Sequence, residues 1–121
     1  MPIINIEDVR IEEFETGRTY QTLVGDKEGS TPVRVGIQTS PPGYSTGTHS
    51  HPYMEIITVI EGTGEAWLDG EGDGIPIGPG STIVAPPQYR ARFSEYRANA
   101  DAILWRACVA DTLQPSRWTG F

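Results

Sequence analysis

Apolar and polar residues alternate along this chain in short runs, and Gly and Pro separate one run from the next. The clearest run is Val33–Thr39, in which Arg34, Gly36 and Gln38 share one face of an expected strand and three apolar residues share the other. No segment shows a convincing helical period, and the short acidic segment 7–14 is the only candidate for a helix. The pattern therefore predicts about nine short strands: Thr19–Leu23, Val33–Thr39, Gly47–His51, Ile56–Glu61, Glu65–Leu68, Ile75–Ile77, Thr82–Ala85, Arg90–Ser94 and Ala102–Val109.

Glycine-rich segments indicate the turns between these strands. Segment 61–65, EGTGE, suits a hairpin between the strands on either side of it, because glycine accepts a positive φ. DGEGDG at 69–74 and GPG at 78–80 mark the next two turns. Short strands at close spacing favour a sandwich or a barrel over β-α-β units, so the expected fold class is all-β. We expect one domain over residues 1–121, in which residues 111–121 form a C-terminal tail.

Composition and charge exclude several classes of protein. The net charge is −7, which repels phosphate backbones and anionic membranes, so neither nucleic acid nor a membrane is expected as a partner. No apolar run approaches the ~20 residues of a membrane span. The first residues lack the basic and apolar regions of a signal peptide, so a cytoplasmic protein is expected. Cys108 is the only cysteine, which excludes an internal disulfide and a cysteine-based zinc cluster.

The only two histidines of the chain stand two residues apart, shortly before a carboxylate. On a strand, His49 and His51 would project from the same face, with Cα atoms about 6.5–7 Å apart. Glu55 has the same parity, and a hairpin would return its carboxylate to the imidazoles. Two imidazoles and one carboxylate ligate non-haem Fe(II) and catalytic zinc. Residues 35–89 contain no Lys or Arg, which suits a cation, although an H-x-H pair alone is common on protein surfaces.

The complete spacing around the histidines is more specific than the pair. Gly43, His49, His51, Glu55 and Gly62 fit G-x5-H-x-H-x3-E-x6-G, and this pattern resembles the first motif of the cupin superfamily at every named position. The resemblance implies a small double-stranded β-helix, or jelly-roll barrel, with the ligands inside. It also implies a homodimer and a divalent metal ion held by the two imidazoles and the carboxylate. Fe(II) is the first expectation for the metal, with Zn(II), Mn(II) and Ni(II) as alternatives.

The second cupin motif, G-x5-P-x-G-x2-H-x3-N, is matched only in part. Gly80 and Pro86 fit it, but Gln88, Ala91 and Glu95 stand where Gly, His and Asn are expected. The usual third histidine is therefore absent, which excludes a site of three His and one Glu. A metal bound here would keep two or three positions for water, substrate or dioxygen.

Several further residues are expected to line a pocket beside the metal. If Ala91 faces inward, Tyr89 and Phe93 share its face by parity and narrow the pocket. Tyr53 is placed to line the mouth. Arg34 and Gln38 share a polar strand face, from which an arginine can grip a carboxylate, although an arginine facing solvent is the commoner case.

Two classes of function fit these residues. The first is a small metal-dependent enzyme that acts on an oxo, hydroxy or carboxylate compound at an open site of two His and one Glu. Fe(II) there would favour oxygenase chemistry, and the other metals an isomerase or lyase step. The second class is a binding or sensing module with weak or no metal, whose barrel holds a small ligand unchanged. The intact first motif favours the enzyme, whereas the missing third histidine favours the module.

Overall fold

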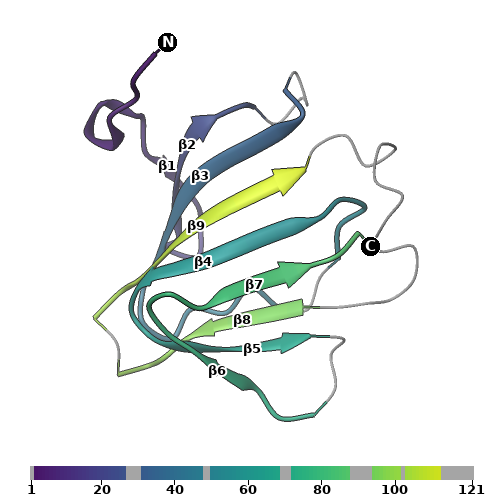
Figure 1. The fold of residues 1–121 in the computed structure, drawn as a ribbon. Helices are drawn as coiled ribbons and strands as arrows, with labels where there is room; N and C mark the ends of the chain where they lie inside the picture. Colours follow the sequence, from purple (N-terminus) through teal and green to yellow (C-terminus); the bar gives the residue numbers. More distant parts are fainter. Residues whose placement is uncertain are drawn as a thin grey trace.

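The computed structural model describes residues 2–26, 31–47, 50–68, 72–87, 94–101 and 103–112. They form two antiparallel sheets (Figure 1), preceded by a 3-10 turn, η1. The elements are η1 (Ile6–Asp8), β1 (Glu12–Glu13), β2 (Thr19–Val24), β3 (Val33–Ser40), β4 (Glu55–Glu61), β5 (Gly64–Leu68), β6 (Ile75–Ile77), β7 (Thr82–Ala85), β8 (Ser94–Ala98) and β9 (Trp105–Thr112). The expected all-β class is confirmed, and the acidic segment near the N-terminus forms the turn and a short strand.

The six-stranded sheet has the order β1-β2-β3-β9-β4-β7, and the three-stranded sheet has the order β6-β5-β8. The two sheets pack on each other through one apolar core to which both contribute. Its buried members are Tyr20, Ile57, Val59, Ala66, Ile77, Ile83, Tyr96, Ala98, Trp105, Ala107 and Val109. No helix in the described part of the chain is long and apolar enough to span a membrane.

The alternation expected in β3 is confirmed, but its polar face points into the molecule. Arg34 and Gln38 line an internal cavity, and only 8% of Gln38 is exposed. Val33, on the other face, is 39% exposed. The face of β3 that lines the cavity is therefore polar, whereas on the apolar face Val33 is exposed and Ile37 is buried.

Two expectations about strands and turns were wrong. Gly47, Ser50 and His51 lie outside any strand, so the argument that the histidines share a strand face does not hold. The EGTGE segment closes no hairpin, because β4 pairs with β7 and β9 whereas β5 pairs with β6 and β8. The segment instead forms a corner between the sheets. Gly62 adopts a φ of +84° there, and a Cβ on it would collide with the backbone at Leu104.

The C-terminal boundary also differs from the expectation. Strand β9 continues through Thr112, so Asp111 and Thr112 belong to the six-stranded sheet and not to a tail. Residues 113–121 lie outside the described residues. The strand expected at Arg90–Ser94 falls mostly outside them too, and β8 begins at Ser94.

A glycine in β3 makes room for the Tyr20 ring. A Cβ built on Gly36 would lie 2.5 Å from the Tyr20 Oη, well inside van der Waals contact. We therefore expect Gly36→Ala to displace this ring and to lower the free energy of unfolding by about 1–3 kcal/mol, as overpacking commonly does. Chemical denaturation measures the loss.

Gly78→Ala is the matched control for Gly36→Ala, because its Cβ would meet only the Thr63 Cγ2, at 3.8 Å. Equal stability losses in the two variants would contradict the steric explanation.

Candidate functional site

A cavity of about 620 Å³ occupies the interior beside the core. Its walls come from β2, β3, β4, β8 and β9, from the turn between β1 and β2, and from segments 44–46 and 51–53. A void of this size is in the range of small-molecule sites. This cavity, which is open to solvent on one side, is therefore the candidate functional site.

His51 and Glu55 meet at the wall of this cavity. The His51 Nε2 lies 3.7 Å from the Glu55 Oε2, and the two side chains are 32% and 11% exposed. The Tyr53 ring stacks on the imidazole, with centroids 4.7 Å apart and planes 14° from parallel. The imidazole is therefore held against the tyrosine, with one edge toward the carboxyl group.

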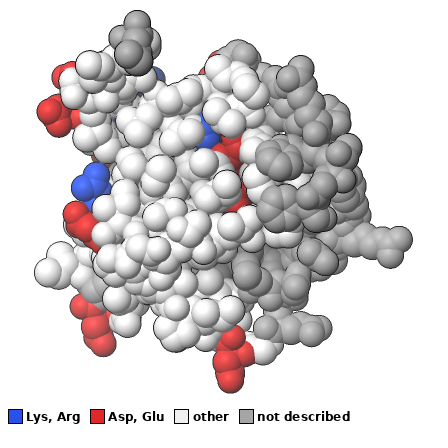
Figure 2. Space-filling model, in the orientation of Figure 1, with Lys and Arg blue, Asp and Glu red and all other residues white. Residues whose placement is uncertain are grey.

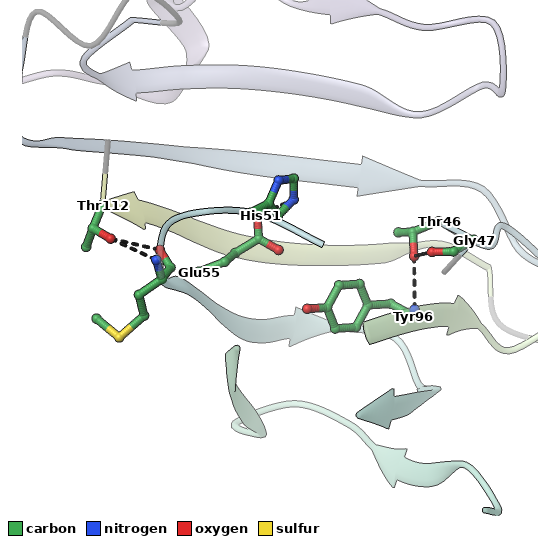
Figure 3. A network of polar contacts seen from close by, with 7 residues as sticks. Thr46, Gly47, His51, Glu55, Tyr96 and Thr112 are labelled. Carbon is green, nitrogen blue, oxygen red and sulfur yellow. Dashed lines mark hydrogen bonds and ion pairs between the residues drawn. The ribbon is translucent and has the colours of Figure 1, made fainter. Parts of the chain in front are cut away.

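Thr112, a residue outside the histidine motif, holds the segment before β4 in place through Met54. The backbone N–H of Met54 donates to the Thr112 Oγ1 at 3.0 Å, and the Thr112 N–H donates to the Met54 carbonyl at 3.0 Å. Figure 3 shows this clamp beside Glu55, with the Tyr96 hydroxyl pointing toward the same space as the carboxyl group. The end of β9 thus fixes where β4 begins and where Glu55 enters the cavity.

Glu55 is a buried carboxyl group with a second one beside it. It faces Asp111 across the β4–β9 pairing, and 8% of Glu55 and 6% of Asp111 is exposed. Burial and the neighbouring Asp111 raise the pKa of Glu55 to about 9, whereas a hydrogen bond from Tyr96 and the charge of Arg18 act against the rise. Without a metal, Glu55 is therefore protonated at neutral pH.

Asp111 is a functional candidate that the sequence analysis missed. The sequence does hold a signal for it, because Trp105, Val109 and Asp111 share one parity and all three line the cavity. The assignment of residue 111 to a tail concealed this pattern. One of its oxygens, Oδ1, is buried and accepts no hydrogen bond from a described residue.

Two tyrosines supply neutral donors to the cavity. Burial raises the pKa of Tyr20 to about 12, and burial followed by the charges of Asp111 and Glu55 raises the pKa of Tyr53 above its ordinary value. Both phenols therefore keep their protons across the physiological range. Each can donate a hydrogen bond to a bound molecule.

Arg34 faces the cavity rather than solvent, which corrects the commoner expectation for such an arginine. Its guanidinium lies 4.6 Å from the centroid of the Tyr20 ring and donates to the Thr22 Oγ1 at 3.0 Å. It also lies 3.9 Å from the Glu12 Oε2. Gln38, on the same face, donates to the Ser40 Oγ at 3.0 Å. Both side chains are thus fixed by neighbours on their own sheet.

The structure brings together five of the residues selected from the sequence: His51, Glu55, Tyr53, Gln38 and Arg34 all line the cavity. The remaining four, His49, Tyr89, Ala91 and Phe93, lie outside the described residues. The turn between β1 and β2 adds Phe14 and Arg18, which the sequence analysis did not select because a turn carries no strand parity.

The described donors fit part of a metal site. Ligand atoms about 2.1 Å from a tetrahedral ion stand roughly 3.4 Å apart, and the His51–Glu55 separation of 3.7 Å is close to this value. Within the described residues, however, no group of three or more His, Cys, Asp or Glu side chains is arranged to hold a metal ion. His51 and Glu55 therefore fit as two ligands of a larger set. His49, the third expected ligand, lies outside the described residues.

Comparisons with known proteins agree with this architecture. No curated protein matches the chain. The polyketide cyclase RemF from Streptomyces resistomycificus is 22% identical, with a TM-score of 0.78 over 94% of this chain and 80% of that one. A predicted oxalate decarboxylase from Thermotoga maritima is 17% identical, with a TM-score of 0.75 over 92% of this chain and 98% of that one. KdgF from Halomonas sp. is 22% identical, with a TM-score of 0.68 over 88% of this chain and 89% of that one.

These three structures share the fold, and the sequence itself gives the family. Residues 36–103, more than half of the chain, match the cupin domain family. The matched segment contains the complete first motif and the part of the second motif that is present. The chain, a nearly all-β jelly-roll barrel, therefore belongs to the cupin family.

Proposed function

We propose that this cupin is a metal-dependent enzyme that acts on a small oxo, hydroxy or carboxylate compound inside the cavity. The observation that carries the proposal is the meeting of His51 and Glu55, 3.7 Å apart, at the wall of a cavity of about 620 Å³. His49 is proposed as the third ligand. The proposed cofactor is a divalent metal ion, with Fe(II) first and Zn(II), Mn(II) or Ni(II) as alternatives.

A divalent ion at an open site would polarise a carbonyl, hydroxyl or carboxylate oxygen of the substrate. The chain's own residues would orient the rest of the molecule. Tyr20 and Tyr53 keep their protons and serve as donors, and Ile57, Trp105 and Val109 give the cavity an apolar wall that limits water.

The proposed reaction is of the oxygenase or the isomerase/lyase type. The structural neighbours support the second type, because one is a polyketide cyclase and another is a predicted oxalate decarboxylase. The buried Asp111, which is not a proposed ligand, supports it as well, since a carboxyl group beside the substrate can accept and return a proton.

A second candidate function is the binding or sensing module. It is favoured by the second motif, in which Ala91 replaces the usual histidine, and by the absence of a group of three metal-binding side chains among the described residues. In that case the same cavity would hold its ligand unchanged.

Elemental analysis of protein purified without added metal, followed by turnover assays, separates the two candidates. We expect close to one divalent ion per chain, and conversion of keto acids or diketones that ceases when a chelator removes the metal. Oxygen consumption during turnover would assign the oxygenase type, and anaerobic turnover the isomerase or lyase type. A metal-free protein that retains a co-purified small molecule unchanged would overturn the enzyme proposal.

The homodimer expected from the cupin resemblance has a candidate surface. An apolar row crosses the outer face of the six-stranded sheet, and paired registers from β2 to β7 align Val24, Val35, Ala110, Ile56 and Val84. Val24 and Val84, at its two ends, are 42% and 40% exposed. We propose that a second copy packs on this face, because a two-fold axis brings the same apolar row together with itself.

Sedimentation at micromolar concentration tests the dimer. We expect the wild-type chain to sediment as a dimer and Val84→Lys as a folded monomer, because the lysine charge would have to be buried against the partner. Thr82→Lys places the same charge at a neighbouring exposed position of β7, at the edge of this row. Its sedimentation shows how far a charge at the edge affects the dimer. A strictly monomeric wild-type chain would refute the proposal.

The cytoplasmic location stays a prediction.

A further inference from the structure

The turn between β1 and β2 presents a cation to the cavity. Gly17 donates to the Phe14 carbonyl at 3.0 Å and Phe14 donates to the Arg18 carbonyl at 3.0 Å, so the turn is closed by its own backbone. The Arg18 guanidinium lies 4.1 Å from the centroid of the Phe14 ring. Both residues line the cavity. Arg18 is thus a planar cation held on an aromatic face at the wall of the site.

Arg18 differs from Arg34 in forming no ion pair within 4 Å with a described carboxylate. Arg34 is balanced by Glu12 at 3.9 Å and donates to Thr22 at 3.0 Å. For Arg18, the Nε–H is buried and donates to none of the described residues. A buried donor without an acceptor costs free energy, and an acceptor on a bound molecule recovers it.

The unsatisfied groups of the cavity are mostly donors. Buried atoms of cavity residues that bond to no described residue are Arg18 Nε, Arg34 Nε, Tyr20 Oη, Trp105 Nε1 and the acceptor Asp111 Oδ1, and Glu12 Oε2 is a further unsatisfied acceptor outside the cavity lining. This excess of donors around the cavity favours a ligand with acceptor oxygens.

The walls around these donors are aromatic. Besides the His51 imidazole, six aromatic rings of described residues line the cavity: Phe14, Tyr20, Tyr44, Tyr53, Tyr96 and Trp105. Flat aromatic surfaces favour a planar, conjugated ligand body over a flexible polar chain. Figure 2 shows that residues other than Lys, Arg, Asp and Glu cover most of the described part of one face of the molecule, with acidic and basic residues visible near its centre.

We propose that Arg18, supported by Phe14, forms an anion subsite, and that the ligand of the cavity is a conjugated or aromatic carboxylate. The carboxylate accepts hydrogen bonds from the Arg18 guanidinium, and its planar body lies among the aromatic rings. This inference rests on the proposed function only in that the ligand occupies the same cavity. It assigns the substrate class, which the metal ligands alone leave open.

Isothermal titration of chelator-treated protein at pH 7 tests the subsite. The probes are cinnamate and its uncharged analogue cinnamamide, which have the same planar body. We expect wild-type protein to bind cinnamate at least tenfold more tightly than cinnamamide. Arg18→Met should abolish this preference and Arg18→Lys should retain part of it, because lysine keeps the charge but loses the planar fork.

Arg97→Met is the matched control, because Arg97 also stacks on an aromatic ring, 4.7 Å from the centroid of Trp67, but lies outside this cavity on β8. It should leave the preference for cinnamate unchanged. Thermal unfolding of each variant verifies that it is folded. Absence of the preference in wild-type protein, or its survival in folded Arg18→Met, would overturn the subsite.

The metal measurements separate this inference from the proposed function. A protein that prefers cinnamate but never binds metal would support the subsite and refute the proposed metal-dependent enzyme. A protein that binds metal and catalyses a reaction, but whose Arg18→Met variant still prefers cinnamate, would support the proposed enzyme and refute the subsite.

Discussion

Replacing His51 with Ala is expected to weaken divalent-metal binding more than ~100-fold, because loss of a direct ligand exceeds the 10–100-fold cost of losing a residue that only supports one. The remaining described donor, Glu55, is protonated at neutral pH and gives up its proton reluctantly. The protein should therefore be nearly metal-free after dialysis. Elemental analysis and isothermal titration with Zn(II) measure the change.

Tyr53→Phe is the control for this substitution. It keeps the ring that stacks on the imidazole at 4.7 Å and removes only the hydroxyl group. We expect its metal content to equal that of the wild-type protein. Undiminished metal binding by His51→Ala would remove this histidine from the ligand set and with it the proposed centre.

The fold could be predicted from the sequence because its signals are local. Alternation in β3 and the turns at 69–74 and 78–80 identify strands and their ends from neighbouring residues alone. Pairing is not local. The EGTGE segment has the composition of a hairpin, yet it forms a corner between the sheets, where Gly62 lies against the backbone at Leu104. Only the position of β9 in space distinguishes the two outcomes.

The candidate site was predictable where a motif fixed the spacing. His51 and Glu55 were identified by their motif and lie together, although the strand argument used for the histidines was wrong. Gly43 and Gly62, at the two ends of the motif, both adopt positive φ. The motif therefore reflects the backbone conformation at its ends as well as the proposed metal ligands. Residues that reach the cavity from distant segments, such as Arg18 and Asp111, carry no motif. Asp111 has only its strand parity with Trp105 and Val109 as a signal, and the role of Arg18 follows only from the tertiary structure.

Raising the pH is expected to destabilise the metal-free protein between about pH 4.5 and 9, because Glu55 binds its proton more tightly in the folded state. Its pKa rises from 4.5 to about 9 on folding. Between these values the folded state holds a proton that the unfolded state has released. The free energy of unfolding therefore falls as pH rises, by up to about 1.4 kcal/mol per pH unit for one proton.

The groups that face Glu55 come from several elements: His51 from the preceding segment, Asp111 from β9, Tyr96 from β8 and Arg18 from the β1–β2 turn. Asp111 supports protonation of Glu55, whereas Arg18 and Tyr96 oppose it. Glu55→Gln replaces the protonated carboxyl with a neutral group of similar shape. We expect this variant to be more stable than wild-type protein at pH 8 and to lose most of the difference at pH 5.

Urea denaturation of chelator-treated protein at intervals from pH 5 to pH 8.5 measures this prediction. Glu61→Gln is the matched control, because the Glu61 side chain is 53% exposed and lies 3.8 Å from Arg106, away from the cavity. It should reproduce the wild-type pH profile. If Glu55→Gln does the same, the carboxyl group is already ionised in the folded protein. The centre would then be an anionic site prepared for a cation, rather than a protonated pair from which the metal must displace a proton.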